Sequence, residues 1–360
     1  MMSVRPVLIM AGGTGGHVFP ALAVADELRS RGVPIVWLGT HKGIEARVVK
    51  QAGYQIEWLS ITGLRGKSAL TLLLAPFRLL MACAQASRVL WQRKPSVVLG
   101  MGGFTAGPGG LMAWLMRRPL LIHEQNAVAG MTNRILAHLA SEVLEAFPQT
   151  FSRKSRTVGN PVRPEIQQLS DPQQRIGSHH NALRLLVIGG SLGAVRLNQV
   201  VPEAVARIEN GARPEILHQT GKTNLEATRE AYRDHGVDAR IEAFIDDMAE
   251  AYGWADLVIC RAGAMTVFEL AAAGVGSILV PYPHAVDDHQ TANAQYLVDA
   301  GAAILRQQTE LSSEWLSDTI SRMTGQRDTL VNMAMAARRM AKPEAANEVA
   351  NRCMQVGELA

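Results

Sequence analysis

Residues 7–17 read VLIMAGGTGGH, an apolar run that enters a glycine-rich turn and then a helix-like pattern. A strand that leads through such a turn into a helix N-terminus is a place to bind phosphate. Glycines let the backbone approach the ligand, and free N–H groups together with the helix dipole favour an anion. The same arrangement recurs at residues 185–194, which read LLVIGGSLGA. Two such units predict two similar α/β domains that face a shared ligand.

The composition of the 360-residue chain fits two domains with sizeable cores, since 48% of the residues are hydrophobic. The net charge of +4 permits an anionic substrate or an anionic membrane surface, and no block of like charges resembles a nucleic-acid arm. Cys83, Cys260 and Cys353 are widely spaced and form no Cys-x-x-Cys motif, which argues against a disulfide scaffold or a zinc ribbon. The cysteines fit a reducing cytoplasm, and the N-terminus lacks the layout of a signal peptide.

Short apolar runs alternate with helical patterns along most of the chain, which predicts doubly wound parallel sheets. The polar residues 167–181 predict a connector between the two halves, and the chain after Gly301 is expected to be mostly helical. The predicted strands are 7–11, 35–38, 56–59, 97–99, 120–123 and 142–144 in the first half, and 185–188, 215–218, 239–243, 257–260 and 277–280 in the second.

Several segments that follow predicted strands in the first half would lie on one edge of the sheet, where open α/β sheets bind ligands. The glycine-rich residues 100–110 indicate a close backbone approach, either to a ligand or to another helix. The polar residues 123–126 suit a cleft lining. His17 ends the first turn at a helix N-terminus, where the dipole favours a neutral imidazole. It is either a general base or a residue that caps the helix or orients a ligand.

The second half carries two further candidate segments. Glu269 lies in the first turns of the helix after strand 257–260; it either accepts hydrogen bonds from a ribose diol or complements the helix dipole. Residues 281–290 hold acids, histidines and an amide that suit the recognition of sugar hydroxyls. Their adjacent carboxylates and histidine do not converge easily on one ion, so no metal site is predicted there.

The segment from Leu70 to Ala86 is nearly all apolar and has basic residues around it. Pro76 and Arg78 interrupt the run, so a transmembrane helix of about 20 apolar residues is not expected. Two interpretations stay open: a buried crossover helix, or an interfacial patch that docks on anionic lipid. The basic residues are Arg65, Lys67, Arg78, Arg88, Arg93 and Lys94.

These motifs together resemble the MurG family, whose members are UDP-N-acetylglucosamine–N-acetylmuramyl-(pentapeptide) pyrophosphoryl-undecaprenol N-acetylglucosaminyltransferases of peptidoglycan synthesis. The matching stretches follow the family order over nearly the whole chain. They are residues 12–17, 100–110, 123–129, 159–163, 189–197, 261–274 and 281–293.

The resemblance implies a GT-B glycosyltransferase fold, in which two Rossmann-like α/β domains with parallel sheets are separated by a deep cleft. Residues 1–162 would form an acceptor domain that faces the membrane, and residues 163–342 would form the UDP-GlcNAc domain. A C-terminal helix at about 343–360 would pack back on the first domain.

In the first domain, the resemblance implies an acceptor site and a catalytic base. Thr14, Gly15 and Gly16 would line the side of the cleft that receives the diphosphate and the sugar of the acceptor. Asn126 would reach the GlcNAc group, and His17 is the family's usual candidate for the base.

In the second domain, the resemblance implies the donor site. Arg163 and Ser191 would contact the nucleotide and its phosphates, while Ile245 would meet uracil through its backbone. Glu269 would hold the ribose, and Gln290 would bind sugar hydroxyls. Further backbone N–H groups would come from Ala264, Met265, Thr266, Val267 and Phe268. Ala262 and Phe268 stand where many relatives have Ser, so the resemblance carries no hydroxyl contact at these two positions.

The implied reaction is an inverting transfer. The muramoyl 4-hydroxyl of undecaprenyl-diphospho-MurNAc-pentapeptide (lipid I) attacks the anomeric carbon of UDP-α-GlcNAc and gives the β-1,4 linkage of lipid II. Because no Asp-x-Asp motif is evident, no metal or other cofactor is expected to be obligatory, and a divalent cation would at most stimulate the reaction.

The lipid acceptor favours the membrane-docking interpretation of the segment from Leu70 to Ala86. The resemblance thus implies a peripheral protein on the cytoplasmic face of the inner membrane, with cell-wall synthesis or division proteins as partners and no nucleic acid. Three rivals stay open: a nucleotide-sugar epimerase of the same fold, a dinucleotide-dependent oxidoreductase and a non-catalytic membrane scaffold. Against the oxidoreductase, Val18 stands where a Gly-x-Gly-x-x-Gly motif needs its third glycine.

Overall fold

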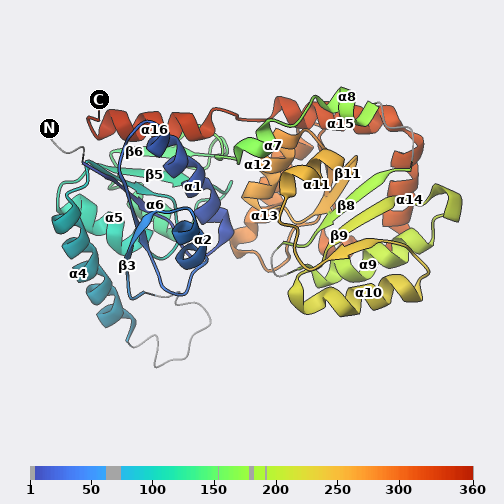
Figure 1. The fold of residues 1–360 in the computed structure, drawn as a ribbon, viewed down its shortest axis with the longest axis horizontal. Helices are drawn as coiled ribbons and strands as arrows, with labels where there is room; N and C mark the ends of the chain where they lie inside the picture. The colour runs from blue at the N-terminus through green and yellow to red at the C-terminus, as the bar shows by residue number, and fades with distance from the viewer. Residues whose placement is uncertain (1–4, 62–73, 153, 178–181, 191–192, 360) are drawn as a thin grey trace. The chain divides into compact units, whose positions relative to one another are not determined.

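Figure 1 shows the computed structural model of the chain, which describes residues 5–61, 74–152, 154–177, 182–190 and 193–359. Two compact units make up the chain. Unit 1 comprises Met1–Arg163 and Lys342–Ala360, and unit 2 comprises Pro164–Ala341. Each unit is built on one sheet of parallel strands.

Unit 1 holds a seven-stranded sheet in the order β3-β2-β1-β4-β5-β6-β7. Its strands are β1 Val7–Met10, β2 Ile35–Gly39, β3 Gln55–Trp58, β4 Val97–Gly100, β5 Leu120–Glu124, β6 Glu142–Glu145 and β7 Arg156–Thr157. Its helices are α1 Gly15–Ser30, α2 Glu45–Gln51, α4 Ala75–Arg93, α5 Ala106–Leu115, α6 Met131–Leu136 and α16 Ala345–Val356.

Strand β1 shows why the sheet of unit 1 needs helices on both faces. All four of its side chains are buried, and successive side chains point to opposite faces. Val7 and Ile9 belong to the core formed with α1 and α16, whereas Leu8 and Met10 belong to the core formed with α4 and α5. An uninterrupted apolar run is what a strand buried on both faces requires.

The strand order places the candidate site of unit 1. β1 pairs with β2 on one side and with β4 on the other, so the order of the strands reverses beside β1. The turns after β1, β4 and β5 therefore lie at the carboxyl edge of the sheet, next to this switch point, where open α/β sheets bind ligands.

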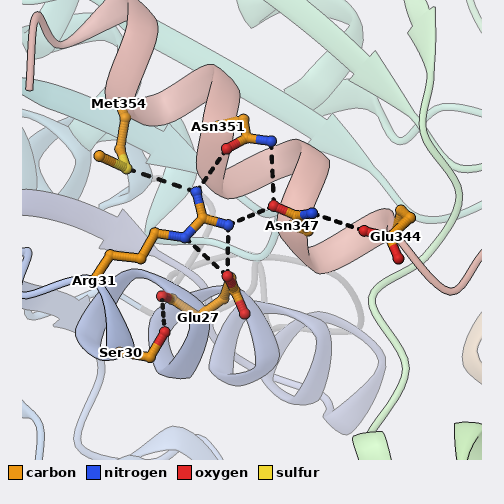
Figure 2. Close-up of polar contacts among 7 residues, drawn as sticks. All are labelled: Glu27, Ser30, Arg31, Glu344, Asn347, Asn351 and Met354. Atoms are coloured by element: carbon orange, nitrogen blue, oxygen red, sulfur yellow. Dashed lines mark hydrogen bonds and ion pairs between the residues drawn. The ribbon is translucent and has the colours of Figure 1, made fainter. Parts of the chain in front are cut away.

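Helix α16 comes from the end of the chain but completes unit 1, where it lies along α1 (Figure 1). It also packs against β4. Val349 and Cys353 of α16 are fully buried in the core shared with α1. The guanidinium of Arg31 bonds Glu27 of α1 together with Asn347 and Asn351 of α16 (Figure 2). Farther along α16, the Arg352 guanidinium forms a second anchor through a forked pair with Glu142 of β6; its Nη2 lies 2.6 Å from Oε2.

Unit 2 holds a six-stranded sheet in the order β10-β9-β8-β11-β12-β13. Its strands are β8 Arg184–Ile188, β9 Glu215–Gln219, β10 Arg240–Glu242, β11 Leu257–Cys260, β12 Gly276–Leu279 and β13 Ala303–Leu305. Its α-helices are α7 Pro164–Gln167, α8 Pro172–Gly177, α9 Val195–Ala206, α10 Leu225–Asp234, α11 Met248–Trp254, α12 Ala264–Ala273, α13 His289–Val298, α14 Ser313–Gly325 and α15 Arg327–Arg339.

The predicted alternation of strands and helices is confirmed, and the misses are short elements. The mostly helical chain expected after Gly301 contains strand β13, which pairs in parallel with β12 at the edge of the sheet. The predicted connector contains α8, which packs against α15. Two-residue β7 was also missed. Elements of two to six residues give too few repeats for a hydrophobic period to be visible in the sequence.

Candidate active site

The first glycine-rich turn is braced by Glu45, a fully buried residue at the start of α2. Its carboxylate accepts hydrogen bonds from the Gly13 N–H at 3.0 Å, the Thr40 N–H at 2.9 Å and the Thr40 hydroxyl at 2.7 Å. A Cβ on Gly12 would lie 2.7 Å from the Glu45 carboxylate, so a larger residue there would displace the carboxylate from these hydrogen bonds. The Gly13 N–H is therefore already bonded to a carboxylate within the protein.

The third glycine-rich turn packs directly on the first. A Cβ on Gly103 would lie 2.2 Å from the Gly12 carbonyl oxygen, and one on Gly102 would lie 2.7 Å from Nδ1 of His17. Both glycines have positive φ, at 85° and 96°. The sequence left open a close approach of residues 100–110 to a ligand or to another helix. The structure shows Gly103 against the first turn and Gly102 against His17 of α1, so packing accounts for both glycines.

The N-terminus of α1 leaves backbone donors for a ligand. The first N–H groups of a helix have no partner within the helix, and the side chain of the N-cap residue Thr14 makes no capping hydrogen bond. The His17 N–H donates to the Thr14 carbonyl, so the backbone donors that this turn keeps for a ligand are the N–H groups of Gly15 and Gly16. Gly16 and Thr14 are exposed.

The His17 side chain is half-buried, and its Nδ1 lies 2.8 Å from Oε1 of Gln125. The amide nitrogen of Gln125 lies 3.0 Å from Nδ1 of His123, whose Nε2 lies 2.9 Å from the Gly159 carbonyl. His123 is fully buried, and this burial lowers its pKa to about 4. The structure therefore brings His17 together with the polar run at residues 123–126.

Asn126 is held by Glu124, the buried last residue of β5. The Glu124 carboxylate accepts from the Asn126 N–H at 3.0 Å and from its side-chain amide at 3.2 Å, and also from Asn133 at 2.9 Å. Arg163, the last residue of the first part of unit 1, has its guanidinium 5.9 Å from the ring centroid of Phe19 on α1.

The glycine-rich turn of unit 2 is braced by a neutral group. Gln219, the buried last residue of β9, donates to the Gly190 carbonyl at 3.1 Å and accepts from the Ile245 N–H at 2.9 Å. Gly193 has φ of 78°, and a Cβ on it would lie 2.0 Å from the Thr220 carbonyl oxygen. Ser191, which was expected to contact the phosphates, lies outside the described residues.

Helix α12 starts at the carboxyl edge of the same sheet, after β11. Its N-cap residue is Gly263, whose carbonyl already accepts from the Val267 N–H at 3.0 Å. Side chains of Val267 and Phe268 are buried, and Phe268 stacks on Tyr296 with ring centroids 5.4 Å apart. The N–H groups that α12 does not use itself are those of its first turn, Ala264, Met265 and Thr266.

Three further side chains lie around this edge of unit 2. The Glu269 carboxylate accepts from the hydroxyl of buried Tyr252 at 3.2 Å. Gln290 accepts from the Tyr282 N–H at 2.9 Å through its side-chain oxygen. The Arg261 guanidinium donates to the carbonyls of Val280 and Pro281, and burial lowers its pKa.

A cavity of about 850 Å³ runs along β9, β10 and α11 and includes Ile245. Its walls carry six carboxylates and one guanidinium: Glu215, Asp238, Glu242, Asp246, Asp247 and Glu250 against Arg240. Because such walls repel a diphosphate, we do not assign the phosphates of a nucleotide to this cavity.

Known proteins match this chain over its full length. The glycosyltransferase family 28 N-terminal domain matches residues 7–145, and the C-terminal domain of the same family matches residues 184–349. A UDP-N-acetylglucosamine–N-acetylmuramyl-(pentapeptide) pyrophosphoryl-undecaprenol N-acetylglucosamine transferase from Nitrosococcus oceani is 57% identical over 357 residues, covering 99% of both chains. A transferase of the same name from Marinobacter nauticus is 54% identical and covers 98% of this chain and 97% of its own.

The crystal structure of MurG from Acinetobacter baumannii matches with a TM-score of 0.85 and 43% identity, over 98% of this chain and 99% of that one. The chain belongs to the MurG family. The resemblance and the two-domain GT-B fold expected from the sequence are thereby confirmed, and the chain is a hexosyltransferase. The spinosyn forosaminyltransferase SpnP, at 13% identity and a TM-score of 0.70, shares the fold.

The residues that brace this MurG-family site were missed by the sequence analysis. Glu45, Gln219 and Tyr252 lie in no glycine-rich motif, and Gln125 was noted only as part of a polar run. Gln125 and Gln219 do share one signal, since Gln219 is the last residue of β9 and Gln125 directly follows the last residue of β5. Glu45 and Tyr252 carry no such signal. Each lies in a helix, α2 or α11, and no pattern in the sequence indicates that this helix contacts the site.

Proposed function

We propose that this chain transfers GlcNAc from UDP-GlcNAc to the muramoyl 4-hydroxyl of lipid I and so makes lipid II. The proposal rests on the full-length match, at 57% identity, to a transferase named for these substrates. Unit 2 binds the donor, and unit 1 binds the acceptor and supplies the base. Among the rivals, an epimerase of the same fold is not favoured, because the full-length relatives described above are named as transferases.

His17 is the base in this proposal. As the C1–O bond to UDP breaks and its electron pair leaves with the diphosphate, the 4-hydroxyl oxygen bonds the anomeric carbon from the opposite side. The hydroxyl proton passes to the imidazole of His17. General-base catalysis needs an unprotonated ring nitrogen, and an imidazole offers one to the hydroxyl proton.

The donor is held by groups of unit 2 together with Arg163. Glu269, oriented by Tyr252, accepts from the ribose hydroxyls, and Gln290 bonds hydroxyls of the sugar. Because Gln219 occupies the Ile245 N–H, Ile245 would meet uracil through its carbonyl oxygen. Arg163, Ser191 and the first-turn N–H groups of α12 (Ala264, Met265 and Thr266) stabilise the charge that develops on the departing UDP.

The departing UDP needs no obligatory metal ion in this proposal, because a guanidinium and backbone N–H groups can stabilise the same charge. We expect turnover to persist after dialysis against EDTA, with at most a few-fold stimulation when Mg²⁺ is restored. Turnover that disappears with EDTA and returns with Mg²⁺ would overturn this part of the proposal.

The decisive experiment for the activity uses radiolabelled UDP-GlcNAc and a lipid I analogue with the full-length protein. The expected product is a labelled disaccharide-lipid that forms only when the acceptor is present. If folded protein yields no such product, the transferase proposal fails. If it consumes UDP-GlcNAc without acceptor, the epimerase becomes the better explanation.

Unit 1 also carries the surface that we propose for membrane docking. Helix α4 packs one face in the core of unit 1 as a crossover helix, but its other side exposes Phe77 at 66% and Leu80 at 69%. The exposed apolar surface continues onto α5 and α6, which pack in series beside α4. Its exposed members are the N-cap residue Leu74 and Phe77, Leu79, Leu80, Met81 and Trp91 of α4, Trp114 and Leu115 of α5, and Met131 and Ile135 of α6.

The charge of the three helices supports an anionic lipid surface as the partner, since α4, α5 and α6 contain no acidic residue. Arg88, Lys94 and Arg117 are exposed there, whereas Arg93 pairs with Glu57 of β3. Residues 70–73, together with Arg65 and Lys67, lie outside the described residues. Within the described ranges, no helix is both long and apolar enough to cross a bilayer.

We therefore propose a peripheral protein on the cytoplasmic face of the inner membrane, where it would meet other proteins of cell-wall synthesis and division. Leu80→Glu is expected to weaken binding to vesicles of anionic lipid by about tenfold, because it puts a charge into the apolar surface. Activity on a water-soluble acceptor should persist. Asn210→Glu in unit 2 adds the same charge as a control, and equal vesicle binding by the two variants would contradict the proposal.

A further inference from the structure

Four groups of unit 1 form a single line of hydrogen bonds that ends at His17. From the buried end, the line runs from the Gly159 carbonyl to Nε2 of His123 at 2.9 Å, and from Nδ1 of His123 to the Gln125 amide nitrogen at 3.0 Å. It then runs from Oε1 of Gln125 to Nδ1 of His17 at 2.8 Å. Because His123 and Gln125 are at most 1% exposed, water does not compete for these bonds.

The buried end of the line fixes the protons of His123. A backbone carbonyl only accepts, so Nε2 of His123 must carry the hydrogen that reaches Gly159. Burial keeps the His123 ring neutral by lowering its pKa, and a neutral ring has one N–H only. Nδ1 of His123 is therefore an acceptor.

The middle of the line fixes the amide of Gln125. Its nitrogen faces two acceptors, Nδ1 of His123 at 3.0 Å and the His123 carbonyl oxygen at 3.2 Å. A flipped amide would put its oxygen against that carbonyl and leave both acceptors without a hydrogen. The backbone of Gln125 is held as well, since Asn160 donates to its carbonyl at 3.0 Å. The amide oxygen thus has to face His17.

The amide oxygen of Gln125 only accepts, so Nδ1 of His17 must be the nitrogen that carries hydrogen. We propose that Gln125 is a positioning residue, which holds His17 in its Nδ1–H tautomer and leaves Nε2 as the proton acceptor of the transfer. This inference rests on the base role of His17 proposed above. No described group bonds Nε2, which leaves that nitrogen open to a substrate hydroxyl.

This line of hydrogen bonds suits a base that has to be neutral before the reaction. When the 4-hydroxyl proton moves to Nε2, the new imidazolium keeps its Nδ1–H bond to Gln125, so no group has to turn. An amide oxygen fixes the tautomer without the full negative charge that would favour the protonated ring before substrate binds. His123 is separated from His17 by two hydrogen bonds, and its role is only to orient the Gln125 amide.

The first test reads the tautomer in the unaltered protein. In the full-length chain labelled with ¹⁵N-histidine, the His17 signals are assigned by their loss in His17→Gln. At a pH where His17 is neutral, we expect a protonated Nδ1 and an unprotonated Nε2. A neutral His17 with its hydrogen on Nε2 overturns the proposal without any variant of Gln125 having to fold.

The second test removes the orienting amide. Gln125→Met keeps a similar length but accepts no strong hydrogen bond, so His17 should populate both tautomers and kcat should fall by about tenfold or more, within the range of general-base effects. The KM for UDP-GlcNAc should change by less than about twofold. Gln173→Met, at an exposed position of α8, is the matched control, and circular dichroism checks the fold. A folded Gln125→Met with the wild-type tautomer overturns the proposal.

Gln125→Glu tests whether residue 125 acts on His17 through its hydrogen bond or only fills space beside it. A carboxylate next to Nδ1 still accepts but adds negative charge, which stabilises the imidazolium and should raise the pKa of His17. The acid limb of the kcat profile should therefore move to higher pH, and an unmoved limb in the folded variant counts against the proposal. The base role fails separately if His17→Ala keeps its turnover, because the tautomer spectra report on Gln125 whether or not His17 is the base.

Discussion

The two glycine-rich turns look alike in sequence, but groups of different charge brace them. In unit 1, a buried carboxylate, Glu45, takes the Gly13 N–H. In unit 2, a neutral amide, Gln219, takes the Gly190 carbonyl. A fixed negative charge beside a turn opposes a second anion there, whereas an amide adds no net charge. Glycine spacing thus identifies the turn, and the group behind it affects how well the turn suits an anion. We propose the second turn for the diphosphate of UDP, while Gly15 and Gly16 of the first turn stay available to the acceptor.

From this difference we infer separate tasks for the two turns. The turn of unit 2 is the better place for the diphosphate of the nucleotide. The turn of unit 1 keeps fewer donors, Gly15 and Gly16, and adds an imidazole whose orientation is fixed by Gln125. We therefore expect changes near the first turn to act on the chemical step, and changes near the second to act on donor binding.

The largest effect is expected from His17→Ala. Removal of a general base should lower kcat by about 10²- to 10⁴-fold. The affinity for UDP should not change, because the groups that we propose to hold the nucleotide lie mainly in unit 2. Steady-state kinetics and calorimetric titration with UDP measure the two quantities, with His235→Ala on the surface of unit 2 as the control. A loss of UDP affinity with unchanged kcat would reverse the assignment of the turns.

The second prediction concerns acid, because each unit buries a neutral histidine. Burial lowers the pKa of His123 to about 4 and that of His218 to about 3, from an ordinary 6.5. Between pH 6.5 and 4 the unfolded chain binds more protons than the native one, so the free energy of unfolding falls as the pH falls. At about 1.4 kcal/mol per pKa unit, each histidine should cost about 3 kcal/mol by pH 4.

Urea unfolding at several pH values measures this loss. His218→Gln should flatten the pH dependence by about half, because one of the two buried rings is gone. The exposed His235 serves as the control position, since His235→Gln should leave the slope unchanged. A pH dependence that survives replacement of both buried rings would show that other groups cause it.

Glu45→Gln tests the brace of the first turn and should have the third-largest effect. The amide retains the shape, but its NH₂ group faces donors that the carboxylate oxygens accept from. A lost hydrogen bond to a charged group costs about 1.5–3 kcal/mol, so thermal unfolding should occur several degrees lower. Glu226→Gln on α10 is the exposed control. UDP affinity should stay unchanged; a tenfold loss would mean that the first turn helps to bind the nucleotide.

These braces mark the limit of what the sequence could predict. The strands and both turns are visible because apolar runs of four or five residues and glycine clusters are local signals. Val7–Met10 shows this, since its uninterrupted apolar run predicts the strand and the glycines that follow predict the turn. Glu45 gave no signal, because it reaches Gly13 from 32 residues farther along the chain and only the folded sheet brings them together.

The candidate site shows the same limit at the level of single atoms. The polar run at residues 123–126 suggested a cleft lining, but no pattern could say that Gln125 faces His17 while Glu124 turns to Asn126. Glu124 ends β5 and Gln125 follows it in the loop, so their partners depend on how the surrounding loops fold. The sequence therefore locates the site. The tautomer of His17 and the groups that brace the two turns follow only from contacts in the folded structure.

Gln219→Leu is the counterpart of the Glu45 variant in unit 2, with a smaller effect. It leaves the Gly190 carbonyl and the Ile245 N–H without their partner, which loosens the turn and the uracil contact together. We expect the dissociation constant for UDP to rise about tenfold, equivalent to about 1.4 kcal/mol. With saturating donor, kcat should change little. If kcat falls while UDP affinity holds, the two turns do not divide the tasks as proposed.

Tyr252→Phe should have the smallest effect, because it removes one hydroxyl 3.2 Å from the Glu269 carboxylate. A typical hydrogen bond contributes about 0.5–1.5 kcal/mol, so the KM for UDP-GlcNAc should rise about threefold without a change in kcat. Tyr232→Phe is the matched control: it removes an equally buried hydroxyl of unit 2 that bonds His218 instead. It should lower stability and leave KM as it is. If both variants raise KM equally, the effect comes from loosening of unit 2 as a whole, and Tyr252 has no special part in orienting the residue proposed to hold the ribose.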